Sequence, residues 1–312
     1  MQTFKISGLL LICTLASIYC CASGLSDTTI IKSHLTSITK TNKFRNHNNI
    51  DQLDQTAEYI RTVFAKYSDS VSFQEYTVEG KIYKNVICSF GTENTSRIVV
   101  GAHYDVCGEQ EGADDNASGV VGLLELSRLL KEKKLEYRID LVAYTLEEPP
   151  YFRTEYMGSY IHAKSLVDRK DNVYGMISLE MIGYFKDKEQ SQRYPVGILS
   201  LKYGNVGNYI TLVQKFGAGE FVKKFSKSFK STKTVPVKTF SGPPSLAGID
   251  FSDHLNYWKF GFNALMVTDT SFYRNKNYHQ KTDTMDTLDL DKMGKVIDQV
   301  FNGLIKMTVN IN

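Results

Sequence analysis

Two adjoining segments decide the fold: residues 97–105 read RIVVGAHYD, and residues 112–130 read GADDNASGVVGLLELSRLL. The first is rich in β-branched and small apolar residues, which predicts a buried strand that ends at His103. The second is a polar, acidic turn followed by an apolar run, which predicts a helix that opens directly after the turn. A buried strand that leads through a turn into a helix is the building unit of parallel sheets.

The same alternation continues along the chain. Strands and helices in turn predict an α/β fold with a mixed, largely parallel central sheet and helices on both of its faces. The predicted strands are 71–77, 81–90, 97–103, 138–145, 173–181, 234–239 and 264–269, and the predicted helices are 50–67, 117–131, 155–166, 206–216 and 290–307.

Composition excludes several classes of protein. Of the 312 residues, 42% are hydrophobic and 23% are charged, which is typical of a soluble globular protein and not of a disordered, collagenous or multi-span membrane chain. The formal charge of +3 creates no field that would attract nucleic acid. Because no repeat or linker divides residues 25–312, we expect one domain.

The first 24 residues have the pattern of a secretory signal peptide. Lys5 precedes an apolar run, and small residues follow at positions 21–24. An uncleaved membrane anchor is the alternative, but the run is shorter than the ~20 residues that span a bilayer. The leader predicts a secreted, periplasmic or lumenal protein with no other membrane contact.

Only two cysteines follow the leader, so the chain is not a disulfide scaffold. Cys88 and Cys107 lie near the ends of two candidate neighbouring strands. A disulfide between them and two separate thiols are both compatible with the sequence.

Polar residues cluster where the predicted strands end, which is where sites form in open α/β sheets. Glu180 is a single acid within an apolar run, and a buried carboxylate must be paired, protonated or bound to a metal. The other members of this set are His103, Asp115, Glu147, Glu148 and His279.

Two histidines and four acids form a nitrogen and oxygen ligand set that suits zinc or a similar divalent ion, and both cysteines fall outside it. Two neighbouring cations need a bridging carboxylate and flanking ligands, with one acid left over as a base. Independent capping and core roles for all six residues would require several coincidences.

Six motifs now resemble the co-catalytic zinc aminopeptidases of metallopeptidase family 28, in order and with similar spacing, from residue 85 to the C-terminus. They are GAHYD (101–105), GADDNASG (112–119), EEPPYF (147–152), LEMIGYF (179–185), SDHLNYW (252–258) and YHQKTDT (278–284). The resemblance implies the zinc-aminopeptidase architecture, also called phosphorylase/hydrolase-like, and two divalent metal ions, Zn²⁺ by ligand chemistry.

The resemblance also assigns roles to the ligand set. It implies that Asp115 bridges the two metals, that His103 and Glu180 complete one site, and that Glu148 and His279 complete the other. Glu147 matches the general base, which takes a proton from the metal-bridging water and passes it to the leaving amine.

Further roles follow from the same resemblance. Asp105 matches an acid that orients His103, Asp283 matches a similar partner of His279, and Tyr278 matches a phenol that stabilises the tetrahedral intermediate. A cis peptide bond is implied after Asp115. Many relatives have Asp where this chain has Glu180, and the longer side chain is still a normal zinc ligand.

The activity implied is that of a secreted metal-dependent aminopeptidase acting on peptides with a free N-terminus. Three alternatives are a single-zinc glutaminyl-peptide cyclotransferase, a carboxypeptidase or dipeptidase, and a binding domain without catalysis. The intact DDNASG stretch (114–119) argues against the first. The second needs a basic group for a substrate carboxylate, which the sequence does not assign. The third would lack ligand residues that this chain keeps.

Two patterns invite other interpretations. Ser252, Asp253 and His254 suggest a hydrolase triad, but adjacent residues rarely converge, so we expect a structural loop near the site. Phenylalanines at 221, 225 and 229 among lysines suggest either a packed helix, which we favour, or a membrane-surface helix. We expect the loops 151–156 and 241–251 to line the substrate pocket.

Overall fold

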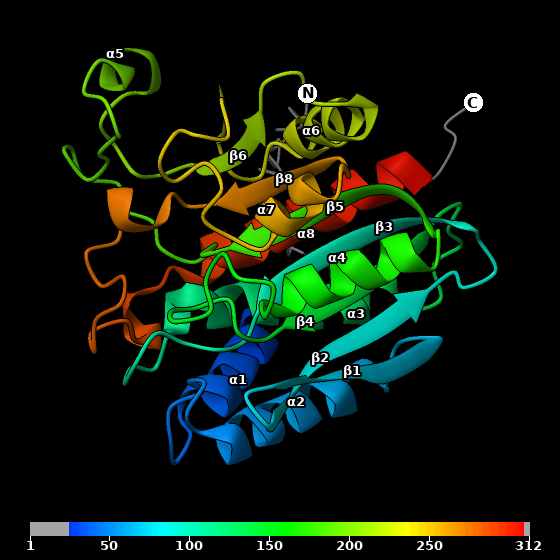
Figure 1. Ribbon diagram of the computed structural model, residues 1–312. Helices are drawn as coiled ribbons and strands as arrows, with labels where there is room; N and C mark the ends of the chain where they lie inside the picture. The colour runs from blue at the N-terminus through cyan, green and yellow to red at the C-terminus, as the bar shows by residue number, and fades with distance from the viewer. Residues whose placement is uncertain (1–24, 309–312) are drawn as a thin grey trace, which may run out of the picture.

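Eight strands form one sheet in residues 25–308, the part of the chain that this computed structural model describes (Figure 1). They are β1 (Ser70–Val78), β2 (Lys81–Phe90), β3 (Ser96–His103), β4 (Arg138–Tyr144), β5 (Asn172–Glu180), β6 (Ile210–Lys215), β7 (Val237–Gly242) and β8 (Ala264–Thr268). Their order across the sheet is β1-β2-β4-β3-β5-β8-β6-β7. The predicted leader, residues 1–24, lies outside the described residues.

The centre of the sheet is parallel and its two edges are not. β4, β3, β5 and β8 run parallel to one another. β2 joins β4 antiparallel and β1 joins β2 antiparallel, whereas β6 joins β8 antiparallel and carries β7 parallel to itself. The predicted mixed, largely parallel sheet is confirmed.

Helices cover both faces of the sheet. On one face α8 packs against α1, α3 and α6, and on the other α4 packs against α7, as Figure 1 shows. The helices are α1 (Thr28–Thr39), α2 (Ile50–Phe64), α3 (Gly119–Leu130), α4 (Gly158–Asp168), α5 (Leu199–Tyr203), α6 (Glu220–Thr232), α7 (His254–Lys259) and α8 (Leu290–Thr308). A strand that is covered by helices on both faces of the sheet has apolar side chains on both faces. This explains the continuous apolar run of β3.

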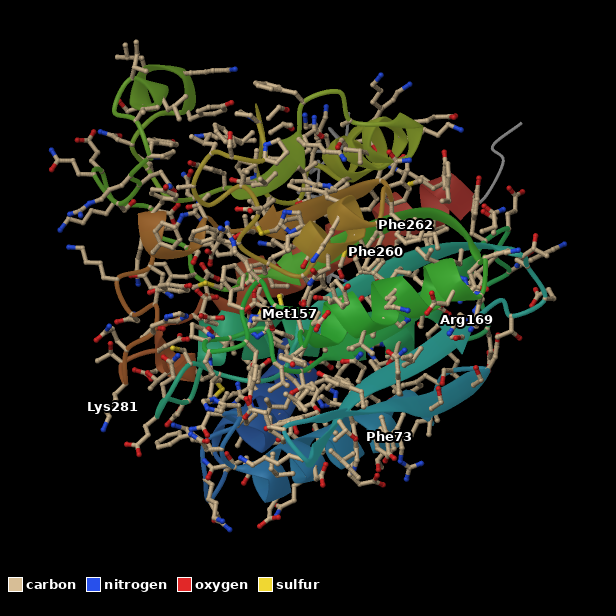
Figure 2. The ribbon with its side chains drawn as sticks, in the orientation of Figure 1. Phe73, Met157, Arg169, Phe260, Phe262 and Lys281 are labelled. Carbon is tan, nitrogen blue, oxygen red and sulfur yellow. The ribbon has the colours of Figure 1, made fainter. Side chains whose placement is uncertain are left out.

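Two hydrophobic cores result from this layering. Along β3, Ile98 and Val100 belong to the main core, whereas Val99 points to the second core on the opposite face. Phe260 and Phe262 lie at the edge of the second core (Figure 2).

The helix predicted over 206–216 is wrong, because this segment contains β6. Its side chains alternate between faces: Ile210 and Leu212 enter the main core, and Val213 packs on the opposite face. Apolar residues on both faces of a short segment do not distinguish a buried strand from a helix by periodicity alone, and pairing with β8 and β7 decides the outcome here.

The structure also decides between the alternatives for α6 and for the two cysteines. Phe221, Phe225 and Phe229 are fully buried, so α6 is a packed helix and its apolar face is not available to a membrane. Cys88 and Cys107 are two free thiols. Within residues 25–308 no helix has the length and apolarity needed to cross a bilayer.

Candidate metal centre and active site

All the residues of the predicted ligand set meet at the carboxyl ends of the parallel strands. His103 ends β3, Glu180 ends β5, Glu147 and Glu148 follow β4, and Asp115 lies in the turn Ala113–Ser118 between β3 and α3. His279 comes from the loop after β8.

The ligand atoms form two groups that share one carboxylate. In the first, His103 Nε2 lies 3.4 Å from Asp115 Oδ1 and 3.5 Å from Glu180 Oε2. In the second, His279 Nε2 lies 3.2 Å from Asp115 Oδ2 and 3.1 Å from Glu148 Oε2. Each oxygen of Asp115 therefore faces a different group, which is the arrangement a bridging ligand needs.

These separations fit divalent cations. With ligand bonds of 2.0–2.1 Å, neighbouring ligand atoms of a tetrahedral zinc site lie about 3.3 Å apart. Asp115 Oδ2, Glu148 Oε1 and His279 Nε2 are also buried without a hydrogen-bond partner, and such atoms require an explanation. The residues thus fit two ions, and the charge of four carboxylates would balance that of two divalent cations.

Asp115, and not its neighbour Asp114, faces the centre. Asp114 instead accepts hydrogen bonds from Gly183 N at 3.1 Å and from Asn275 Nδ2 at 2.7 Å. The Asp283 carboxylate accepts from the backbone N–H groups of Asp114 and Asp115, both at 3.0 Å. Asp283 therefore holds the turn that carries Asp115, and the partnership with His279 that the resemblance suggested is not formed. The peptide bond after Asp115 is cis, as expected.

Asp105 connects His103 to the two acids after β4. Its carboxylate accepts hydrogen bonds from Glu147 N at 3.2 Å and Glu148 N at 3.1 Å. It also lies 3.6 Å from His103 Nδ1, on the side of the ring opposite the ligand atom. The hydrogen-bond partner of His103 Nδ1 is the backbone oxygen of Asp105, at 3.2 Å. Asp105 thus positions three site residues, two through its carboxylate and one through its backbone. Glu147 Oε2 lies 3.8 Å from His103 Nε2, beside the first ligand group.

The pKa values show a site with an excess of negative charge. Burial, and then nearby Asp115, raise the pKa of Glu148 to about 8. Burial raises the pKa of Glu147 well above its usual value despite the opposing effect of His103. For Asp115 burial also acts to raise the pKa, but the close, positively charged imidazoles of His103 and His279 outweigh it and lower the value. Bound cations would supply the missing positive charge.

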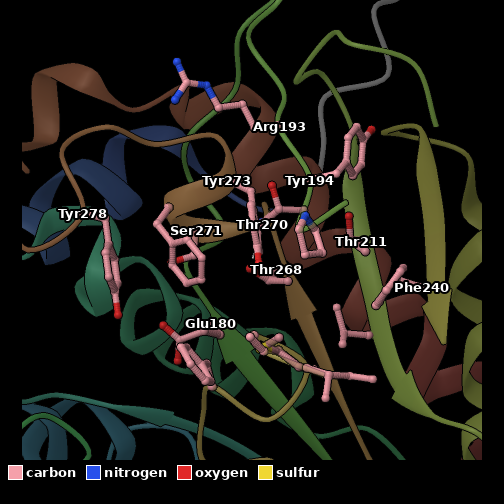
Figure 3. A pocket seen from close by; sticks show the side chains of 18 of the residues that line it. Glu180, Arg193, Tyr194, Thr211, Phe240, Thr268, Thr270, Ser271, Tyr273 and Tyr278 are labelled. Carbon is pink, nitrogen blue, oxygen red and sulfur yellow. Dashed lines mark hydrogen bonds between the residues drawn. The ribbon is translucent and has the colours of Figure 1, made fainter. Parts of the chain in front are cut away.

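A cavity of about 400 Å³ opens beside the ligand set. Tyr278 lines it, at one side of the view in Figure 3, and stacks on His279 with ring centroids 3.8 Å apart. Burial raises the pKa of Tyr278, so its hydroxyl stays protonated and able to donate. Phe152 and Phe251 line the same cavity, so both predicted loops contribute to it.

Sequence reasoning missed two neighbours of the ligand set. Ser252 Oγ donates a hydrogen bond to Glu180 Oε2 at 2.7 Å, so the loop that resembled a triad positions Glu180 instead. His254 accordingly bonds Ile249 O and not a serine. Cys107, which we placed outside the set, lies with Glu148 and His279 in one group of ligand atoms within 4.8 Å of one another. The sequence predicted that the loop of Ser252 lies near the site but not its contact with Glu180, and no sequence signal linked Cys107 to the site.

The sequence model of peptidase family M28 matches residues 85–303. The chain belongs to this family. It is 42% identical to the uncharacterized protein YfbL of Escherichia coli over 271 residues, which are 84% of this chain and 83% of that protein. It is 29% identical to a probable leucine aminopeptidase of Arthroderma otae over 64% of this chain, and it spans half of that relative's length.

Solved structures share the fold. The LapA aminopeptidase of Legionella pneumophila superposes with a TM-score of 0.72 at 19% identity, covering 92% of this chain and 73% of that one. A glutaminyl cyclase of Bacteroides thetaiotaomicron, bound to N-acetylhistamine, gives 0.66 at 19% identity, covering 90% and 98%. At such identities the likeness shows the α/β architecture alone.

Proposed function

We propose that this member of peptidase family M28 is a metal-dependent aminopeptidase with two divalent ions, zinc by ligand chemistry. The observation that carries the proposal is the shared carboxylate of Asp115, which lies 3.4 Å from His103 and 3.2 Å from His279 with one oxygen each. A single-ion site would need no such bridge. Glu147 is then the acid left over.

In this proposal each remaining residue has one chemical task. When bound, the cations would act as Lewis acids that polarise a carbonyl and acidify water. Glu147 takes the proton of the attacking water and delivers it to the departing amine. Tyr278 donates a hydrogen bond to the oxygen that gains charge, and Asp105 holds Glu147 and His103 in place.

The charge of the site supports a substrate with a free N-terminus. The carboxylates of Glu147, Glu148 and Glu180 line the cavity at the end where the scissile bond must lie. They would attract the positive α-amine of a peptide. The printed name of the Arthroderma otae relative is consistent with this substrate class.

A panel of aminoacyl reporters, each with a free or an N-acetylated amine, tests the proposal. We expect cleavage of the free-amine reporters and a loss of at least a hundredfold in kcat/KM on acetylation. Mass spectrometry of a peptide with N-terminal glutamine, incubated in parallel, detects cyclisation as the loss of ammonia. Cyclisation without cleavage of any reporter would refute the aminopeptidase proposal.

We also propose that residues 1–24 are removed as a signal peptide, which leaves residues 25–312 as one peptidase domain that is exported from the cytoplasm. Leu25 N donates to Asp298 Oδ2 at 2.9 Å, and Ser26 N donates to Asp298 Oδ1 at 2.8 Å. After cleavage at this point the new α-ammonium group would pair with the Asp298 carboxylate. N-terminal sequencing of the exported protein tests the cleavage position.

A further inference from the structure

The floor of the cavity is a row of residues that pair across four adjacent strands. Glu180 on β5 pairs with Thr268 on β8, Thr268 pairs with Thr211 on β6, and Thr211 pairs with Lys238 on β7. All four line the cavity. In Figure 3 Glu180, Thr268 and Thr211 follow one another across these strands. The row therefore leads from a proposed metal ligand to an ammonium group.

The ammonium group of Lys238 contacts a backbone oxygen and an aromatic ring and has no carboxylate partner among the described residues. Its Nζ donates to Tyr203 O and lies 3.5 Å from the centre of the Tyr209 ring. Burial, and then nearby Arg274, lower the pKa of Lys238, and no acid among the described residues acts in the opposite direction. Lys238 is half-buried and lines the cavity, and it forms no ion pair with an acid of residues 25–308.

Other polar atoms at this end of the cavity also lack partners. Thr211 lines the cavity and is only 5% exposed. Its buried Oγ1 makes no hydrogen bond. Arg193, the other cation of the lining, is exposed and its side chain points away from the floor (Figure 3). Of the lysine and arginine in the lining, Lys238 and not Arg193 therefore belongs to the floor of the cavity.

Charge is divided between the two ends of the cavity. Asp115, Glu147, Glu148 and Glu180 make one end acidic. Lys238 makes the other end basic. Arg274 also lies over the Tyr209 ring, 4.7 Å from the ring centre. A molecule with an amine at one end and a carboxylate at the other matches this division.

We infer that Lys238 and Thr211 form a carboxylate-recognition site at the far end of the substrate cavity. This inference rests on the proposed peptidase function and narrows its substrate class. The carboxylate comes either from an acidic side chain of the N-terminal residue or from the C-terminus of a short peptide.

The dimensions allow both sources. Strands lie 4.7–4.9 Å apart, so the Cα atoms of Glu180 and Lys238 are separated by about 14 Å across three strand spacings. A glutamate side chain or a peptide of two or three residues, at about 3.3–3.6 Å per residue, fits within this length.

Matched substrate pairs test the inference and separate the two sources. The first pair is the glutamyl and methionyl reporters, and the second is Ala-Ala-Ala with a free or an amidated C-terminus. Each is measured with the wild type, Lys238→Met, Lys238→Arg and the control Lys202→Met, which removes an exposed lysine that lies over the Tyr203 ring outside the cavity lining.

Loss of a charge-assisted hydrogen bond reduces affinity by about ten- to a hundredfold. In at least one pair we therefore expect Lys238→Met to lower the carboxylate-to-neutral ratio of kcat/KM by tenfold or more. Lys238→Arg and Lys202→Met should change this ratio by less than threefold. The pair that responds identifies the source of the carboxylate. Ratios that stay within twofold of wild type for both pairs would overturn the inference.

A binding measurement keeps this test separate from that of the proposed function. In a Glu147→Ala background, calorimetric titration with Ala-Ala-Ala, its amide, Glu-Ala-amide and Met-Ala-amide reports affinity without turnover. We expect Lys238→Met to weaken binding of the carboxylate member of at least one pair by tenfold or more relative to its neutral partner. Equal weakening within every pair contradicts the inference even where hydrolysis occurs, and a melting temperature close to that of the parent confirms that the variant folds.

Discussion

Removing the metal ions should destabilise the protein by an amount that reports how many sites are filled. Asp115, Glu147, Glu148 and Glu180 are each at most 6% exposed, and without cations these carboxylates repel one another or take up protons. An ion at a hundred times its Kd stabilises the native state by about 2.7 kcal/mol. Two independent sites therefore contribute about 5 kcal/mol.

Differential scanning calorimetry measures this contribution. For large domains each kcal/mol changes the melting temperature by about 2 °C or more, so we expect chelation to lower it by about 10 °C. His279→Gln removes a ligand from one group only and should keep about half of the shift. Asp115→Asn weakens both groups and should lose most of it.

His34→Gln is the matched control, because His34 pairs with Tyr59 on α2 away from the ligand set. This variant should keep the full shift on chelation. A melting temperature that chelator leaves unchanged, or a shift that is equal in His279→Gln and the wild type, would refute the two-ion arrangement.

Three further predictions concern single residues. Ser252→Ala removes the hydrogen bond to Glu180 and should weaken binding of one of the two ions by about ten- to a hundredfold, as measured by competition with a chromophoric chelator. Burial lowers the pKa of His162 to about 4, so as pH falls from 6.5 to 4 only the unfolded chain gains this proton. The unfolding free energy should therefore fall by up to about 3 kcal/mol over this range from this residue, and denaturant titrations of His162→Gln should show a shallower decline. Asp298→Asn weakens the contacts with Leu25 and should lower the unfolding free energy of the mature chain by about 1–3 kcal/mol; no change would count against that N-terminal anchor.

The sequence predicts that the residues of the proposed ligand set lie together, because each stands out locally, and the structure brings them together. His103 and Glu180 end apolar strands, and strands that run parallel bring their carboxyl ends together. The choice of Asp115 over Asp114 came from the resemblance, and only the contacts of Asp114 with Gly183 and Asn275 give it a physical reason.

Features that depend on non-local pairing could not be predicted in this way. β6 reads as a helix until its two neighbours in the sheet are known. Lys238 joins the cavity only because β7 lies beside β6, and β6 beside β8, in an order that the chain does not follow. Cys107 is near His279 because a loop 172 residues later (279 − 107) returns to the same strand ends.

Glu147→Ala provides the most direct test of the proposed mechanism. Hydrolysis of free-amine reporters is measured for the wild type and for this variant, with and without chelator, and bound metal is quantified in both proteins. We expect chelator-sensitive hydrolysis by the wild type, a loss of about a hundredfold or more in kcat for the variant, and two metal ions in each protein. Full activity of Glu147→Ala with its metal in place would contradict the role of Glu147 as the base.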